Sequence, residues 1–431
     1  MQTHRYGNGV VLVPDGRSVS GQATPPATPP ATQPRAHPGA HSQALWILVP
    51  TGQRASGEFI DDTLRERAEE KGMTQRLSMA ADFPRQRVEV VRGAGAYAEV
   101  NERFYRRGWT DGLPITPPTL EAVDAMLLGG DRSRTDVLGE LDPLKGLASA
   151  EKVAANAVMA GCAPEHFPVV LRAVEALVSP EFNLRGVQTT DENVAPLLIL
   201  SGPQVRRLEV NDSFGALGPG WRGNASIGRA VRFIMNNLGG GWPGAVSFAG
   251  LGHPGRYSLC FAENQAANPW DPLQVDLGFG AQDTVLTVMR AESVINVTGG
   301  LPEIANVMGS AASGFSMARG GKVAVALAPF TARSLAEEGW NKGDVRTYLH
   351  EHGRLPVSNW DQMWVKRKVV DAQEAAPWLR DAVAEGRIPA VESPEDIVIV
   401  VAGGDVPIAQ HAYFPTWGHP ACCISSVVFH E

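Results

Sequence analysis

The sequence has no apolar run long enough to cross a membrane and no excess of basic residues. None of its apolar segments reaches the roughly 18 residues that a transmembrane helix needs. The formal net charge is -8 and no basic face is evident, which argues against nucleic acid and anionic membrane surfaces as partners. The first apolar run, residues 10–13, is too short for a signal-peptide core. We therefore expect a cytoplasmic protein.

Cysteine is scarce, with four residues in a chain of 431. They are Cys162, Cys260, Cys422 and Cys423, too few for a disulfide scaffold at this length. No CxxC pair occurs, which argues against a structural zinc ribbon. His419 together with Cys422 and Cys423 could bind a soft metal. The alternative is two small side chains near the end of the chain.

The chain is long enough for two or three domains. Residues 24–34, TPPATPPATQP, contain almost no apolar bulk and predict an extended segment. We predict a disordered proline-rich segment over 1–43, a small α/β segment over 44–95, a main catalytic or binding domain over 96–355 and a C-terminal segment over 356–431 that adds a core strand.

Predicted strands and helices alternate along the chain. Apolar or alternating runs predict strands at 44–50, 87–91, 196–202, 256–262, 284–289, 322–327 and 397–402. Helical spacing and capping residues predict helices at 58–72, 94–108, 119–128, 148–160, 164–178, 331–338 and 341–352. The pattern indicates an α/β or α+β fold with mixed sheets, packed helices and two subdomains.

Residues 217–241 form a glycine-rich loop that leads directly into a helix. Asn224 or Ser226 could cap the first helical turn. Arg229, Arg232 and Asn236 then share one helix face. Free backbone N–H groups at a helix start, together with two guanidinium groups further along the helix, form an anion-binding geometry. The predicted substrate-binding residues here are Arg222, Asn224, Arg229, Arg232 and Asn236.

The loop matches neither common nucleotide motif. Gly218, Gly220 and Gly223 have the GxGxxG spacing, but no clear strand precedes them and Pro219 lies inside the motif. No Gly-Lys-Ser/Thr comes after it, so it is not a Walker loop. The alternative to a binding site is a helix-entry turn whose arginines pair with acidic neighbours.

Three further segments carry candidate residues. His253 lies in a loop before a strand and could act as a general acid or base, while Glu263 and Asn264 stand at the carboxyl end of that strand. Cys162 lies between two helices, where the next helix start would favour its thiolate; the alternative is a small buried residue. We expect Cys260 to be a buried strand residue. Thr110 and Asp111 lie on a glycine-bounded loop and could bind a polar group or form an internally satisfied turn.

Several of these motifs together resemble a known family. They are FYRRGWTDGLP (104–114), NAVMAGC (156–162), the 217–241 segment, and LGHPG (251–255) with Glu263 and Asn264 after it. They resemble a bacterial family associated with UGSC-type (seleno)proteins, named after a Sec/Cys-Gly-Ser-Cys motif. The resemblance covers roughly residues 97–355, and more weakly 401–405. No UGSC or CGSC motif occurs, so a redox centre of that kind would have to come from a partner.

These observations predict an enzyme acting on a small anionic metabolite, with a carboxylate as the expected anion, by thiol-dependent redox or sulfur chemistry or as a lyase. Arg229 and Arg232 would hold the anion, Glu263 or His253 would move protons, and Cys162 would be the nucleophile or redox thiol. One alternative is a non-catalytic substrate-binding subunit of a separate UGSC-type redox protein, and another is a soft-metal protein. We expect a homo-oligomer, and the sequence does not identify a cofactor.

Overall fold

The computed structural model describes residues 2–6, 9–13, 44–49, 87–371, 376–418 and 422–430. The chain divides into two compact units, Met1–Ser42 and Gln43–Glu431. In the first unit, β1 (Gln2–Tyr6) and β2 (Gly9–Val13) form an antiparallel pair. The predicted proline-rich stretch and the predicted helix at 58–72 lie outside the described residues. All other described elements belong to the second unit.

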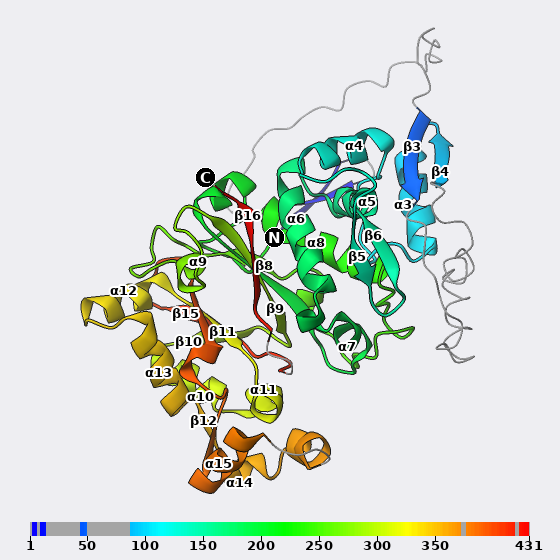
Figure 1. Cartoon of the computed structure of the whole chain (residues 1–431). Helices are drawn as coiled ribbons and strands as arrows, with labels where there is room; N and C mark the ends of the chain where they lie inside the picture. Colours follow the sequence, from blue (N-terminus) through cyan, green and yellow to red (C-terminus); the bar gives the residue numbers. More distant parts are fainter. Residues whose placement is uncertain are drawn as a thin grey trace. The chain divides into compact units, whose positions relative to one another are not determined.

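Two four-stranded mixed sheets form the centre of this unit (Figure 1). The first has the order β16 (Ile424–Phe429), β9 (Thr284–Ala291), β7 (Ala195–Ser201), β8 (Cys260–Ala262), with only β7 and β8 parallel. The second has the order β10 (Ile295–Thr298), β15 (Gln410–Phe414), β11 (Val323–Leu327), β14 (Ile397–Val401), with only β11 and β14 parallel. The predicted α/β or α+β class with mixed sheets is confirmed.

The two sheets pack face to face because their strands alternate between two apolar surfaces. Leu197 and Ile199 of β7 belong to a core that also contains Phe414 of the second sheet, while Leu198 of β7 belongs to the helix-covered core on the other side. The rings of Phe261 and Phe414 stack between the sheets, with their centroids 5.7 Å apart. The result is a four-layer arrangement of helices, sheet, sheet and helices.

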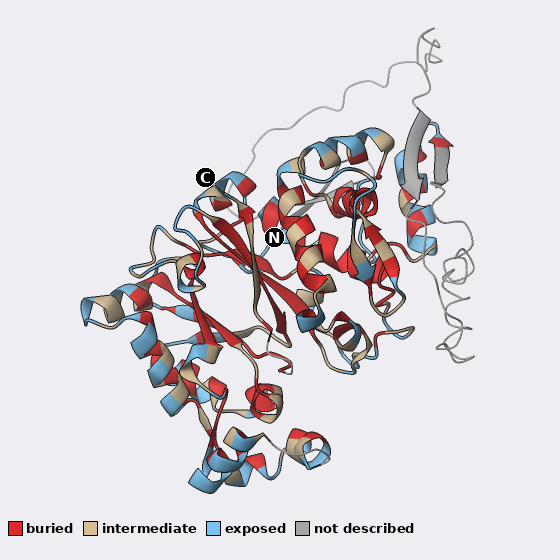
Figure 2. Cartoon of the chain, in the orientation of Figure 1, coloured by how far each residue is buried: buried red, intermediate tan, exposed pale blue. Residues whose placement is uncertain are grey.

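Helices cover the outer face of each sheet, and their buried sides are visible in Figure 2. The first sheet is covered by α6 (Phe167–Val178) and α8 (Arg222–Asn237), and α5 (Ala150–Ala160) packs on these helices with α4 (Leu120–Leu128) beside it. The second is covered mainly by α10 (Leu301–Met308) and α13 (Lys342–His352), while α11 (Gly314–Arg319) and α15 (Pro377–Glu385) add buried residues to the same core. No helix among the described residues is long and apolar enough to span a membrane.

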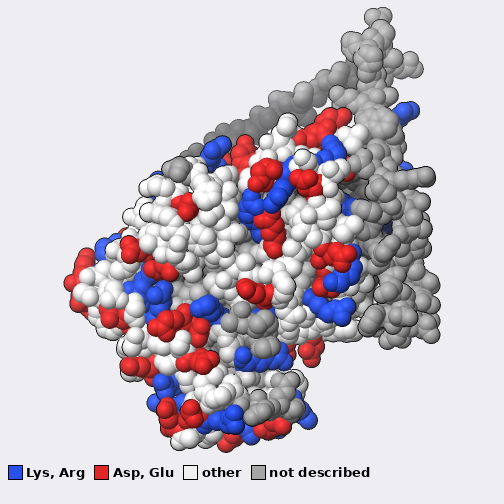
Figure 3. All heavy atoms as spheres, in the orientation of Figure 1, with Lys and Arg blue, Asp and Glu red and all other residues white. Residues whose placement is uncertain are grey.

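The remaining elements connect these layers. They are β3 (Ala44–Val49), β4 (Arg87–Arg92), α3 (Ala96–Arg106), β5 (Val137–Leu141), β6 (Gly146–Ser149), α7 (Leu184–Thr189), α9 (Leu273–Asp276), α12 (Pro329–Glu337), β12 (Arg354–Pro356), α14 (Val357–Trp360) and β13 (Arg387–Pro389). On the face shown in Figure 3, acidic and basic side chains are interspersed, in keeping with the absence of a basic face in the sequence.

Helix α8, which carries the predicted site, begins earlier than its polar residues suggest. Its N-cap is Trp221, which makes no side-chain capping bond, so Asn224 and Ser226 lie inside the helix. The prediction that one of them caps the helix is therefore wrong. By contrast, Thr119 accepts a hydrogen bond from the backbone of Ala122 and caps α4, where the predicted 119–128 helix begins.

Candidate functional site

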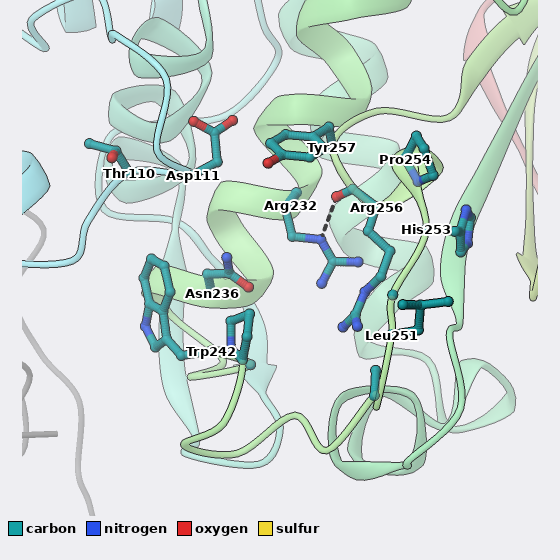
Figure 4. A pocket seen from close by; sticks show the side chains of 14 residues that line it. Thr110, Asp111, Arg232, Asn236, Trp242, Leu251, His253, Pro254, Arg256 and Tyr257 are labelled. Atoms are coloured by element: carbon teal, nitrogen blue, oxygen red, sulfur yellow. Dashed lines mark hydrogen bonds between the residues drawn. The ribbon is translucent and has the colours of Figure 1, made fainter. Parts of the chain in front are cut away.

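A cavity of about 660 Å³ lies between the 110–111 loop, one face of α8 and the 241–257 loop (Figure 4). It brings together five residues that the sequence pointed to, Thr110, Asp111, Arg232, Asn236 and His253. The other lining residues are Gly241, Trp242, Pro243, Ala249, Leu251, Gly252, Pro254, Arg256 and Tyr257.

The local backbone explains how these segments meet. Arg232 and Asn236 are four residues apart on α8, so both project from one face. A side-chain carbon at Gly241 would lie 1.7 Å from Gln188 Oε1, so a larger residue here would require the side chain of Gln188 to move. Gly112 has φ +96°, which turns the chain directly after Asp111.

Arg232 is a buried cation that pairs with no carboxylate of the described residues. Its side chain is only slightly accessible, the residue being 7% exposed, and its Nε donates to the backbone oxygen of Arg256 at 2.9 Å. Its Nη2 is buried and has no hydrogen-bond partner among the described residues. Burial, and secondly the charge of Arg256, lower the pKa of Arg232 to about 9. Such a group is costly to bury unless an anion meets it.

Arg256 is the second guanidinium of the cavity. Its Nη2 donates to Ser247 Oγ at 3.0 Å, and burial lowers its pKa. The sequence pattern identified the surrounding loop but not Arg256 itself as a binding residue. Arg256 is 24 residues from Arg232 in the sequence and comes close to it only in the folded chain, where the two residues are joined by a hydrogen bond.

His253 is a neutral side chain at the edge of the cavity. Its Nδ1 accepts a hydrogen bond from the backbone N–H of Gly255 at 3.2 Å, which assigns the proton of the neutral ring to Nε2. Burial, and then the charges of Arg256 and Arg232, lower the pKa of His253 to about 4. In Figure 4 the ring lies beside the 251–257 loop, away from Asn236 and Trp242. At neutral pH His253 therefore adds no charge to the cavity.

This environment gives a testable pH dependence. The ring of His253 is expected to titrate near pH 4 rather than near 6.5, and binding of an anion beside the two arginines should raise that value. Because the unfolded chain takes up this proton at a higher pH, the contribution of His253 to stability is lost as the pH falls from about 6.5 towards 4. An NMR titration with and without an anion measures the midpoint of His253 and its shift on binding, and His253→Gln identifies the signal of this ring. A midpoint near 6.5 would contradict the assigned environment.

Arg229 does not line the cavity. Its Nε and Nη2 donate to the two carboxylate oxygens of Asp111 at 2.7 and 2.8 Å, and Nη2 also donates to the backbone oxygen of Pro114 at 2.9 Å. The predicted role of Arg229 as an anion ligand is not supported, because these donors are occupied. Instead Arg229 fastens the 110–114 loop to α8, and its pairing neutralises Asp111.

Arg222 and Asn224 also have partners within the fold. Arg222 donates to the backbone oxygens of Gly161 and Cys162, at the end of α5. The side chain of Asn224 accepts from the backbone of Asn211 and donates to the backbone oxygens of Asn211 and Ala216. These two predicted binding residues thus tie neighbouring segments to α8, and neither lines the cavity.

Cys162 lies in the core, away from the cavity. Its thiol donates to the backbone oxygen of Ser226 at 3.3 Å, and burial raises its pKa to about 12. The expectation that a helix start favours its thiolate is therefore wrong, because loss of hydration outweighs the nearby positive charges. Cys260 is a buried strand residue, as predicted.

Cys162→Ser is accordingly expected to leave ligand affinity unchanged within about twofold and to cost about 1 kcal/mol of stability, since only one weak hydrogen bond changes. The native thiol should react with iodoacetamide only after unfolding. Isothermal titration and a timed alkylation assay check these expectations. Rapid alkylation of Cys162 in the native protein would contradict them.

Glu263 and Asn264 form a separate buried cluster at the carboxyl ends of β8 and β14. The Glu263 carboxylate accepts from Asn268 Nδ2 at 2.9 Å and from the backbone N–H of Leu273 at 2.8 Å. Burial raises its pKa to about 7, although Lys342 at 4.0 Å acts in the opposite direction. Asn264 bonds to the backbone of Val401 and Gly403. The pair joins the two sheets, and neither residue lines the cavity.

The predicted soft-metal site falls partly outside the described residues. His419 lies outside the described residues. Burial raises the pKa of both Cys422 and Cys423 to about 11. No group of three or more histidine, cysteine, aspartate or glutamate side chains is placed to hold a metal ion within the described ranges.

Comparison of the chain with protein-family models, with curated proteins and with solved structures gave no match. The function is therefore inferred from the geometry of the cavity.

Proposed function

We propose that the chain binds a small, carboxylated metabolite in the cavity beside α8. The observation that carries this proposal is the pair of guanidinium groups, Arg232 and Arg256, in a cavity where Asp111, the one carboxylate among the described lining residues, is already paired with Arg229. Each arginine disfavours the charge of the other, as the reduced pKa of Arg232 reflects. An anion between them would relieve this repulsion and satisfy the buried Nη2 of Arg232.

We further propose that the chain is an enzyme that transfers a proton on this ligand, as a lyase does. His253 is the candidate side chain: its neutral ring would donate a hydrogen bond from Nε2–H to negative charge that develops on the ligand, while the transferred proton is exchanged with water. The thiol-dependent form of the sequence prediction has less support, because none of the described cysteines lines the cavity. A redox step would need a thiol or selenol from a partner such as a UGSC-type protein.

The binding proposal is tested with a panel of carboxylates in a thermal-shift assay and then by calorimetric titration. A ligand at 100 times its Kd stabilises a folded protein by about 2.7 kcal/mol, which is readily detected. We expect stabilisation of the wild type and of Arg207→Gln, a control that removes an exposed arginine outside the cavity, but not of Arg256→Gln. An equal response of Arg256→Gln would contradict the proposal.

A further inference from the structure

We infer that the ligand is a carboxylate with a broad apolar body, such as an aromatic ring, and that it enters with its carboxylate first. This inference rests on the proposed function and specifies its substrate class. Three properties of the cavity support it, namely the grouping of its two guanidinium groups with apolar side chains on either side of them, the different depths of the charged and apolar side chains, and its volume.

The charged side chains of the lining come from two segments, whereas the large apolar ones come from a single segment. Arg232 projects from α8 and Arg256 from the 242–257 loop, and this loop also supplies most of the apolar surface. The apolar side chains of this loop are Trp242, Pro243, Ala249, Leu251, Pro254 and Tyr257. In Figure 4 the guanidinium groups of Arg232 and Arg256 lie close to one another, with Trp242 and Leu251 on opposite sides of them. A ligand held by its carboxylate at the arginines would therefore extend its remaining atoms over apolar side chains.

The two kinds of lining differ in depth. Arg232 is 7% exposed, whereas Tyr257 is 53% and Leu251 is 93% exposed. The anion-binding group thus lies at the bottom and large apolar side chains lie at the opening. Exposed apolar side chains of this size gain free energy when a ligand covers them. A ligand with an apolar body would cover them, and a purely ionic ligand would leave them in water.

The volume points in the same direction. Pockets for organic ligands span roughly 300–1,000 Å³, and the 660 Å³ of this cavity falls within that range. An isolated carboxylate or phosphate ion would fill only a small part of it. The half-buried indole of Trp242 and the ring of Tyr257 offer the offset or edge-to-face contacts that aromatic groups favour.

The test is calorimetric titration of the full chain with four probes: acetate, phenylacetate, phenylacetamide and inorganic phosphate. We expect phenylacetate to bind at least about tenfold more tightly than acetate or phosphate, because the ring buries apolar surface. Phenylacetamide, which has the ring without the charge, should bind at least about tenfold more weakly than phenylacetate.

Two positions separate the apolar contribution from the ionic one. Trp242→Ala should remove most of the preference for phenylacetate over acetate, while Trp242→Phe should retain it. Tyr257→Ala should also reduce the preference for phenylacetate over acetate. Because Tyr257 is exposed, this substitution is not expected to disturb the fold.

The outcomes distinguish this inference from the proposed function. The inferred apolar body of the ligand is refuted, while the anion site is supported, if acetate or phosphate binds as tightly as phenylacetate in an Arg256-dependent manner. The same conclusion follows if the preference for phenylacetate over acetate is retained in both Trp242→Ala and Tyr257→Ala. If none of the three anions binds, the proposed function fails and the inference fails with it.

Discussion

Arg232→Ala is expected to weaken carboxylate binding by about 1.5–3 kcal/mol, or roughly 10- to 150-fold in Kd. The reason is that Arg232 Nη2 is buried in the cavity wall and has no hydrogen-bond partner within the described part of the chain. A charged hydrogen bond formed there with the ligand would therefore replace no bond between Nη2 and the described residues. The measurement is calorimetric titration with the tightest carboxylate of the panel.

The stability of the ligand-free variants distinguishes a binding arginine from a structural one. Arg232→Met keeps much of the side-chain volume and removes a buried charge that pairs with no carboxylate in the described ranges. Replacing such a charge by an apolar group is often neutral or stabilising. We therefore expect Arg232→Met to lose ligand affinity without losing stability in urea denaturation. A folded variant that binds the ligand as the wild type does would reject Arg232 as a ligand.

Asp111→Ala is expected to destabilise the fold by about 3–5 kcal/mol, because it leaves Arg229 as a buried cation without its partner. The two side chains are only 5% and 16% exposed, and their contact is bidentate at 2.7 and 2.8 Å. The guanidinium also lies over the ring of Phe233, 4.9 Å from its centroid, which limits its access to water. Urea denaturation of the single and double variants measures the effect.

The double variant Asp111→Ala, Arg229→Met should recover part of this loss, since it removes both charges. The exposed pair Arg333 and Asp405, at 44% and 41% exposure, is a matched control. Asp405→Ala should cost less than about 1 kcal/mol. If Asp111→Ala were no more destabilising than Asp405→Ala, Arg229 would not have the structural role assigned to it.

The segments of the candidate site can be predicted from the sequence, but the roles of their arginines cannot. Helical spacing places Arg229 and Arg232 on one face of α8 and predicts that both hold the anion. Which of the two arginines forms an ion pair depends on the position of Asp111, which is 118 positions away in the chain from Arg229. Arg256 joins the cavity through a loop, where no periodicity signals its direction.

In the fold as well, elements marked by a local sequence pattern can be predicted, whereas elements that depend on distant pairing partners cannot. Continuous apolar runs predict strands such as β7, β11 and β14 within one or two residues. Strands β15 and β16 are not predicted: β16 contains Ser425 and Ser426, and its pairing partner β9 lies more than a hundred residues earlier. Strand β8 begins only at Cys260, because residues 254–256 form a short 3-10 turn before it.

A crystal structure of the full chain with phenylacetate is the decisive test of the proposed site, because it shows where the carboxylate lies. We predict density in the cavity, with a carboxylate oxygen about 2.7–2.9 Å from Arg232 Nη2 and the ring towards Trp242 or Tyr257. Phenylacetate bound instead by the 218–224 loop at the start of α8, or absent from the cavity at a saturating concentration, would contradict the proposal.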